Sequence, residues 1–214
     1  MSVDWLTKIG DFKVEKKEIG RPGGKPYFLV SSTMIGVLHT TEGNSVDSDW
    51  KTLNKDFSAP HFITGENRIV QCRPIGVQAA ALKTNPPVFP NVAAQIQIEM
   101  SCKTKMEKGV PVLWLPPPAV LEPTLAVMAW CAKNLEIPLQ KPANWPDDGV
   151  DLKGTIWAAN NKRRKQAAAG LWPKGKGWWM HLEVPAQQKT WHFDCGALRR
   201  TEMFRLAQEM LDKI

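Results

Sequence analysis

An unbroken run of apolar residues at positions 34–38 ends at His39, and the chain then turns polar over residues 40–45. A short apolar run of this kind predicts a buried strand that stops where the polar residues begin. Ser45 can cap a following helix, because its side-chain oxygen can accept a backbone N–H of the first turn. We therefore expect a strand, a loop and then a helix that ends near Lys55.

Two further apolar segments form the pattern of a β-hairpin. Residues 61–64 and 68–72 are strand-like and flank the turn-forming sequence Gly-Glu-Asn at 65–67. Residues 94–101 read as another strand, which carries Glu99 close to its end. The first half of the chain is thus expected to build several strands of one sheet.

Two stretches in the second half follow the period of an amphipathic helix. The first covers residues 122–135, where Pro123 suits a first helical turn and Pro138 prevents continuation. The second covers residues 198–213. The residues expected on the two buried faces are Leu121, Leu125, Met128, Ala132 and Leu135, then Met203, Leu206, Ala207, Met210 and Leu211.

The remaining segments are less regular. Residues 1–26 read as an irregular lead-in, and residues 140–177 read as a loop-rich excursion with many Pro, Gly, Trp, Lys and Asn residues. A last strand is expected within residues 178–184. This mixture predicts one α/β (α+β) domain over residues 27–214, with a central mixed sheet flanked by helices.

Composition narrows the class of protein. The 214 residues are 43% hydrophobic, which is enough for one buried core. The net charge of +7 and the pI of about 9.3 favour polyanionic partners, and the densest basic run, Lys162–Lys165, fits a solvated loop or helix face. No RNA-binding aromatic signature, zinc finger or helix-turn-helix accompanies this charge, so we expect no specific nucleic-acid partner.

Targeting signals and cysteines add further expectations. The chain has no run of about 18 apolar residues, so no transmembrane segment is predicted. Residues 1–20 lack the apolar core of a secretion signal, so we expect synthesis in the cytoplasm and export by another route. The four cysteines form no CxxC pair, and Cys72, Cys102 and Cys131 read as small buried hydrophobic residues.

The candidate chemistry lies in four histidines, at positions 39, 61, 181 and 192. A hydrolytic zinc site needs three protein ligands and an open position for water, and His and Asp side chains can supply them. A nearby carboxylate can accept the proton of that water, and a cationic group can stabilise an oxyanion. The chain holds residues for each role, but spacing alone does not assign them, because no HExxH helix joins the histidines.

Six short segments follow one another in a consistent order. They are Gly36–Gly43 (GVLHTTEG), Ser58–Ile63 (SAPHFI), Ile69–Gln71 (IVQ), Gln95–Met100 (QIQIEM), His181–Pro185 (HLEVP) and His192–Gly196 (HFDCG). Together they resemble the motifs of the type 2 N-acetylmuramoyl-L-alanine amidases. That family includes phage lysins, bacterial cell-wall recycling amidases and the peptidoglycan recognition proteins. The resemblance covers residues 34–136 and 178–212 and implies the zinc amidase fold.

The resemblance also implies roles for individual residues. His39, His181 and Asp194 match the three ligands of a catalytic Zn²⁺ ion, and Glu99 matches the general base. His192 would stabilise the oxyanion or help to protonate the leaving amine. The implied reaction is hydrolysis of the amide that joins the lactyl group of N-acetylmuramic acid to L-alanine of the stem peptide.

The closing motif departs from the family pattern. The family usually has Asp-Pro-Gly where this chain has Asp194-Cys195-Gly196, and some relatives use cysteine as the third ligand, so Cys195 competes with Asp194. The distance from His181 to Asp194 also indicates a small insertion around residues 186–189. We interpret His61 as a structural residue that packs under the site or bonds to a loop.

Ten tryptophans are a high number for this length. Trp172, Trp178, Trp179 and Trp191 gather around the closing motifs, where their rings could line a groove for glycan and peptide. Ordinary packing in the core or in loops is the alternative.

The expected partner is peptidoglycan, both its glycan strand and its stem peptide, and we expect a monomer. A compact basic amidase without a signal resembles a bacteriolytic, antimicrobial phage lysin, which would reach the cell wall in the periplasm through a phage-made pore. A muropeptide-recycling amidase, an antibacterial effector delivered by a secretion apparatus, and a non-catalytic peptidoglycan-binding protein are the alternatives. The complete ligand set favours an enzyme over a binding protein.

Overall fold

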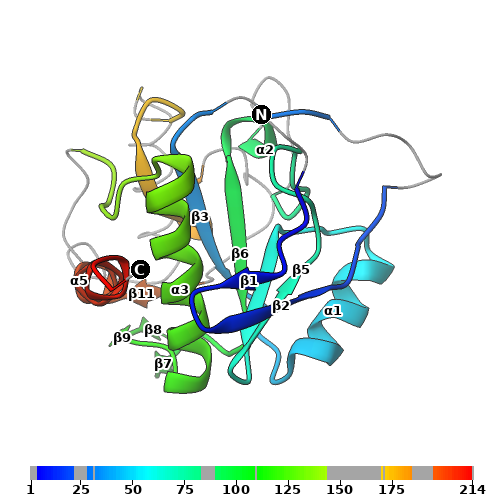
Figure 1. Ribbon diagram of the computed structural model, residues 1–214. Helices are drawn as coiled ribbons and strands as arrows, with labels where there is room; N and C mark the ends of the chain where they lie inside the picture. The colour runs from blue at the N-terminus through cyan, green and yellow to red at the C-terminus, as the bar shows by residue number, and fades with distance from the viewer. Residues whose placement is uncertain are drawn as a thin grey trace.

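The computed structural model describes residues 4–21, 28–30, 32–82, 90–108, 110–143, 170, 172–184 and 195–213. Within these ranges a seven-stranded mixed sheet runs through the centre of the molecule in the order β1-β2-β5-β4-β6-β3-β10 (Figure 1). Its strands are β1 (Lys8–Ile9), β2 (Phe12–Lys16), β3 (Ile35–Thr40), β4 (Phe62–Gly65), β5 (Arg68–Gln71), β6 (Ile96–Met100) and β10 (Gly177–Met180).

The four strands nearest the candidate site run parallel to one another. β3 pairs with β6 and with β10, and β4 pairs with β6, while β5 returns antiparallel to β4 in the predicted hairpin. In this register His39 lies beside Glu99, and Leu38 lies beside Met180. The carboxyl ends of β3, β6 and β10 therefore meet at one edge, which is where open α/β sheets place ligand sites.

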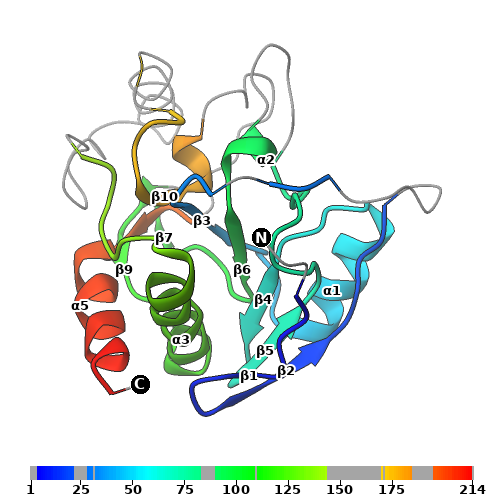
Figure 2. The ribbon, with the colours of Figure 1, turned by 45° about the horizontal axis from the view of Figure 1, so that its top comes forward.

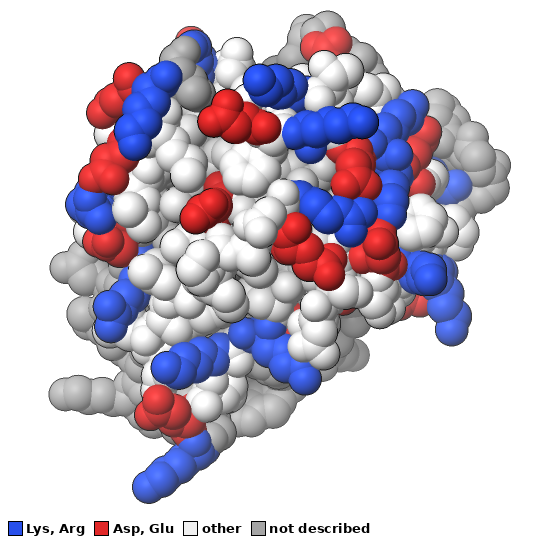
Figure 3. Space-filling model, turned by 60° about the horizontal axis from the view of Figure 1, so that its bottom comes forward, with Lys and Arg blue, Asp and Glu red and all other residues white. Residues whose placement is uncertain are grey.

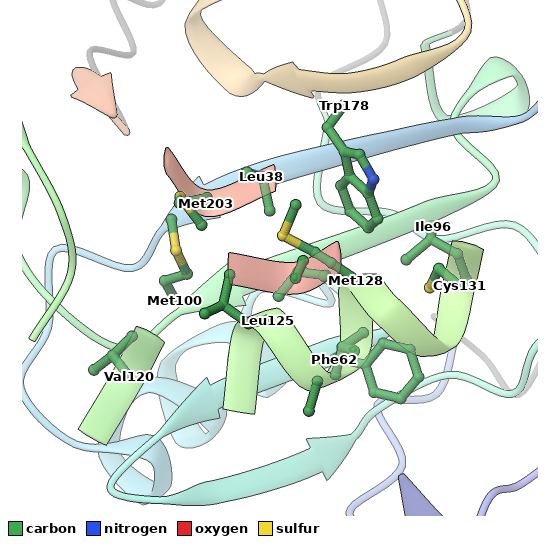
Figure 4. Close-up of a cluster of buried hydrophobic side chains, with 14 of the residues drawn as sticks. Leu38, Phe62, Ile96, Met100, Val120, Leu125, Met128, Cys131, Trp178 and Met203 are labelled. Carbon is green, nitrogen blue, oxygen red and sulfur yellow. The ribbon is translucent and has the colours of Figure 1, made fainter. Parts of the chain in front are cut away.

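Helices cover both faces of the sheet. α3 (Pro118–Leu135) and α5 (Arg200–Leu211) lie side by side on one face (Figures 1 and 2), and α1 (Val46–Lys55) packs on the other. The alternation of side chains along β3 separates the two faces, because Leu38 joins the core under α3 and Val37 joins the opposite cluster. The core under α3 includes Leu38, Phe62, Ile96, Met100, Val120, Leu125, Met128, Cys131, Trp178 and Met203 (Figure 4).

The start of α3 differs from the prediction. The helix begins at Pro118 rather than at residue 122, so Pro123 lies inside it and not in its first turn. A proline in a helix lacks the N–H that would bond to the carbonyl four residues earlier. That carbonyl, of Ala119, instead accepts the backbone N–H of Asn67 in the β4–β5 turn at 2.8 Å. The hairpin thus supplies the hydrogen bond that the proline cannot.

The predicted irregular lead-in over residues 1–26 is wrong for residues 8–16. β1 and β2 form a short hairpin there, and β2 joins the sheet parallel to β5, with Val14 beside Ile69. β2 is short, and Val14 is its only buried residue. Its two lysines, Lys13 and Lys16, are exposed. So weak an alternation is difficult to distinguish from a polar loop in the sequence.

The remaining long elements are confirmed. The strand before His39, the hairpin, the strand that carries Glu99 and both long helices are present, and Ser45 caps α1 by accepting the N–H of Ser48. The last strand is shorter than expected, since β10 ends at Met180 and a 3-10 turn, η3 (His181–Glu183), follows.

Several short elements were not predicted, because two to four residues give no readable period. They are α2 (Pro90–Ala93), β7 (Met106–Glu107), β8 (Val110–Pro111), β9 (Leu113–Trp114) and β11 (Ala197–Leu198). Most of the expected excursion at 140–177, including Lys162–Lys165, lies outside the described residues. None of the helices in the described ranges is long and apolar enough to cross a membrane.

Candidate active site

His39 lies near the end of β3 and is buried on the face of the sheet opposite α3. The preceding residue, Leu38, points into the α3 core, so alternation along the strand turns the imidazole to the other side. Glu99 occupies the matching position on β6, and its Oε1 atom lies 3.7 Å from Nδ1 of His39. Pairing of two parallel strands is thus what brings this histidine and this carboxylate together.

His181 joins them from the other side of β3. It is the first residue of η3, directly after Met180, the last residue of β10. Its ring centroid lies 4.5 Å from that of His39, with 53° between the ring planes. Both histidines are almost completely buried. The structure therefore brings together three of the site residues predicted from the sequence, from three neighbouring strands.

The other two predicted site residues, His192 and Asp194, lie outside the described residues, as do residues 186–189 and Trp191. In the part of the chain that is described, no group of three or more His, Cys, Asp or Glu side chains could hold a metal ion. The chemistry of the two histidines fits zinc, because two adjacent imidazoles can supply two of the three protein ligands that a hydrolytic site needs. The set would need one further ligand.

Cys195, the alternative third ligand, lies within the described residues but does not form a three-ligand group with His39 and His181. Its thiol donates to the backbone oxygen of Leu38 at 3.1 Å, and its own carbonyl accepts the indole N–H of Trp114 at 3.1 Å. The residue is fully buried in the core under α3. Asp194 stays the predicted third ligand.

His61 is a structural residue, as predicted. Its Nδ1 accepts the backbone N–H of Gln97 at 3.1 Å, and its Nε2 lies 2.9 Å from the carbonyl oxygen of Val77. With Nε2 as donor, both ring nitrogens are used in the neutral form. Burial lowers the pKa of His61 to about 4, which keeps the ring neutral at physiological pH. The imidazole thus joins β6 to the segment after β5.

A polar network that the sequence did not reveal fixes the loop after His39. Glu42 accepts hydrogen bonds from the hydroxyl of Thr40 at 2.7 Å and from the hydroxyl and backbone N–H of Thr104. Asp49, at the start of α1, accepts the hydroxyls of Thr41 and Ser101. These partners are separated by up to 62 residues, so no local pattern could have indicated them.

A groove of about 610 Å³ opens at the same edge of the sheet but does not contain the three site residues. It lies between residues 43–44, residues 101–105 and the start of α3. Figure 3 turns this edge toward the viewer and shows Lys and Arg side chains interspersed with Asp and Glu. Among the described residues on this face, the two signs of charge are therefore mixed.

The described cysteines and the tryptophans near the site are packed in the interior. Cys72, Cys102 and Cys131 are buried, and burial raises the pKa of the Cys102 thiol to about 12. Trp172 and Trp179 pack edge to face at 5.1 Å between ring centroids. Trp178 is fully buried against the α3 core.

No protein-family model and no curated protein matches the chain. Among solved structures, the hydrolase AmiA of Staphylococcus aureus, solved with its ligand, matches over 93% of this chain and 83% of its own, at 9% identity and a TM-score of 0.52. PlyL matches at 11% identity over 94% and 96% of the two chains, with a TM-score of 0.49. The N-acetylmuramoyl-L-alanine amidase LysC from Clostridium intestinale URNW matches at 12% identity over 92% and 97%, also with a TM-score of 0.49.

At these identities the likeness concerns the fold. The mixed α/β domain expected from the sequence is confirmed, and the chain shares its fold with the hydrolase AmiA.

Proposed function

We propose that the protein is a zinc-dependent N-acetylmuramoyl-L-alanine amidase that hydrolyses the bond between N-acetylmuramic acid and L-alanine in bacterial peptidoglycan. The observation that carries this proposal is the meeting of His39, His181 and Glu99 at the ends of three neighbouring strands. The fold shared with the hydrolase AmiA supports it.

His39, His181 and Asp194 are the residues that would hold the metal ion. A zinc ion held by three such ligands polarises the scissile carbonyl and lowers the pKa of its bound water to about 7. His39 and His181 fit this role because both rings are buried and lie next to each other at the sheet edge.

Glu99 acts as the general base. The residue is only 6% exposed, and the pairing of β3 with β6 holds its carboxylate beside His39. It accepts a proton from the attacking water and returns it to the nitrogen of L-alanine as the amide bond breaks. The products are a lactyl carboxylate on the glycan and a free amine on the peptide. His192 stabilises the negative charge that develops on the carbonyl oxygen.

We place the enzyme among bacteriolytic lysins that act on the cell wall from the periplasm after synthesis in the cytoplasm. The net charge of +7 supports this setting, because a cationic protein is attracted to an anionic envelope. The catalytic carboxylate beside the two histidines favours an enzyme over a protein that only binds peptidoglycan.

The test is digestion of purified peptidoglycan by the zinc-loaded protein, followed as loss of turbidity. The wild type should clear the suspension, lose activity with a zinc chelator and regain it with added zinc. Glu99→Gln should retain zinc but lose activity by about 100-fold or more, the range expected for a general base. Glu107→Gln changes an exposed carboxylate on β7 and should behave as the wild type. Full activity in Glu99→Gln, or no response to the chelator, would overturn the proposal.

A further inference from the structure

The turn that carries His181 is held by a buried ion pair. Glu183 closes this turn, and Arg200 begins α5 on the α3 side of the sheet. The guanidinium donates two parallel hydrogen bonds to the carboxylate, each 2.9 Å long. The two side chains are 0% and 1% exposed, so the pair is shielded from water and salt.

Both groups of the pair also bond to the backbone next to His181. The Glu183 carboxylate accepts the N–H of Met180 at 2.9 Å, and Arg200 donates to the carbonyl oxygen of Trp178 at 3.1 Å. His181 itself accepts the N–H of Val184 through its carbonyl oxygen at 3.1 Å. The backbone is therefore fixed on each side of the histidine, and with it the direction of the Cα–Cβ bond from which the imidazole extends.

The pair also links this turn to the closing segment of the chain. Arg200 lies five residues after Cys195, whose thiol bonds to the carbonyl of Leu38 directly before His39. The segment from 195 to 200 is thus attached to both strands that bring the histidines together. In sequence this segment directly follows Asp194, the predicted third ligand.

A buried ion pair is an unusual way to stabilise a core. The cost of removing two charges from water often exceeds their attraction, and apolar side chains of similar volume can replace such pairs without loss of stability. What apolar side chains cannot reproduce is the fixed bidentate geometry and the two bonds to the backbone. The arrangement therefore serves the geometry of the turn more than the stability of the fold.

We propose that Glu183 and Arg200 are a positioning pair that sets the orientation of His181 for metal binding. This inference rests on the proposed function, because it takes His181 to be a zinc ligand. Neither residue touches the reacting atoms; the pair acts through the backbone of the turn. Loss of the pair should weaken zinc binding by about 10- to 100-fold, as loss of residues that orient metal ligands commonly does.

The decisive variant is the double substitution Glu183→Leu with Arg200→Met, which fills the same space with apolar side chains. We expect the metal-free variant to melt near the temperature of the metal-free wild type, while its zinc affinity, measured by competition with a chromophoric chelator, falls at least 10-fold. The visible spectrum of the cobalt-loaded variant should also change, because the geometry of the ligands is altered. A double variant with wild-type affinity and spectrum would overturn the proposal.

Two further variants complete the experiment. Glu202→Gln with Arg205→Gln removes an exposed ion pair from the same helix, and its zinc affinity should equal that of the wild type. If the apolar double variant does not fold, Glu183→Asp decides, because it keeps the charge and shortens the side chain by one methylene. A folded Glu183→Asp variant should bind zinc more weakly, and unchanged affinity and cobalt spectrum would contradict the inference. Failure of the wild type itself to bind zinc would instead contradict the proposed function.

Discussion

At the scale of single residues, the described histidines have different roles because their surroundings differ. His39 and His181 lie with their rings 4.5 Å apart at the edge of the sheet. His61 is buried directly before β4 and uses both ring nitrogens in hydrogen bonds to the backbone. His61 is structural because these bonds hold it to the backbone, whereas His39 and His181 are candidate ligands because their rings lie together near Glu99.

The buried His61 predicts a pH dependence of stability. Its pKa is lowered from 6.5 to about 4 by burial, so between these values the unfolded chain binds a proton that the folded chain does not. The contribution of neutral His61 to the free energy of unfolding is complete above pH 6.5 and is lost as the pH falls toward 4. One pKa unit corresponds to about 1.4 kcal/mol, so the full loss is on the order of 3 kcal/mol.

Urea unfolding at pH 7.5 and pH 4.5 measures this effect in the wild type and in His61→Gln. Other groups titrate in both proteins, so the informative quantity is the difference between them. The wild type should lose more stability on acidification than the variant. An equal loss in the two proteins would show that His61 is protonated as easily in the folded as in the unfolded chain.

At the scale of elements, α3 is fastened to the sheet by polar contacts as well as by its apolar face. The carbonyl of Ala119, which Pro123 cannot use, accepts the N–H of Asn67. One turn further along, the hydroxyl of Thr124 lies 2.7 Å from that of Thr64 on β4. Both threonines are completely buried. Helix and hairpin are thus joined at two neighbouring points.

This contact predicts a non-additive mutation cycle. Thr124→Val keeps the shape of the side chain but removes the partner of a buried hydroxyl on Thr64, which should cost about 1–3 kcal/mol of unfolding free energy. Thr64→Val should cost less, because the Thr124 hydroxyl keeps its hydrogen bond to the carbonyl oxygen of Val120 at 2.7 Å. The double variant should cost less than the sum of the two single variants, because no unpaired hydroxyl remains.

Chemical denaturation of the four proteins gives the coupling between these two residues. A matched control is Thr52→Val, which changes an exposed hydroxyl that bonds within α1 and should alter stability by less than either buried substitution. Additive losses at positions 64 and 124 would mean that the two hydroxyls do not depend on each other.

The sequence predicted the long elements well because each carries a full period of apolar residues or a cap, as Ser45 does for α1. It did not predict β2, where Val14 is the only buried residue, nor the early start of α3. The carbonyl that Pro123 leaves free in this first part of α3 is bonded by Asn67, which lies 52 residues before Ala119. Tertiary partners, rather than local propensity, decide such boundaries.

The candidate site was predictable only in part. Motif resemblance pointed to His39, Glu99 and His181, and the order of the strands explains why residues so far apart in the chain meet. Glu183 with Arg200 could not be found in this way, because a buried ion pair has no spacing rule in sequence. The roles of His192 and Asp194 stay predictions.

At the scale of the whole molecule, the candidate site joins distant parts of one sheet. β3 carries His39, β6 carries Glu99, and β10 leads into His181, while residues 195–200 bond to β3 and β10. A site assembled from so many parts forms only when the chain is folded. The proposed activity therefore belongs to the entire domain and not to any one motif.

The most direct test of the central claim is to identify the bond that is cut. Purified peptidoglycan would be digested in water enriched in ¹⁸O, and the fragments analysed by mass spectrometry. The account predicts stem peptides that begin at L-alanine and glycan fragments that carry one ¹⁸O atom in the lactyl carboxylate, with neither product formed after zinc is removed. Fragments cut within the glycan strand or within the stem peptide, or the same products from the chelated protein, would contradict it.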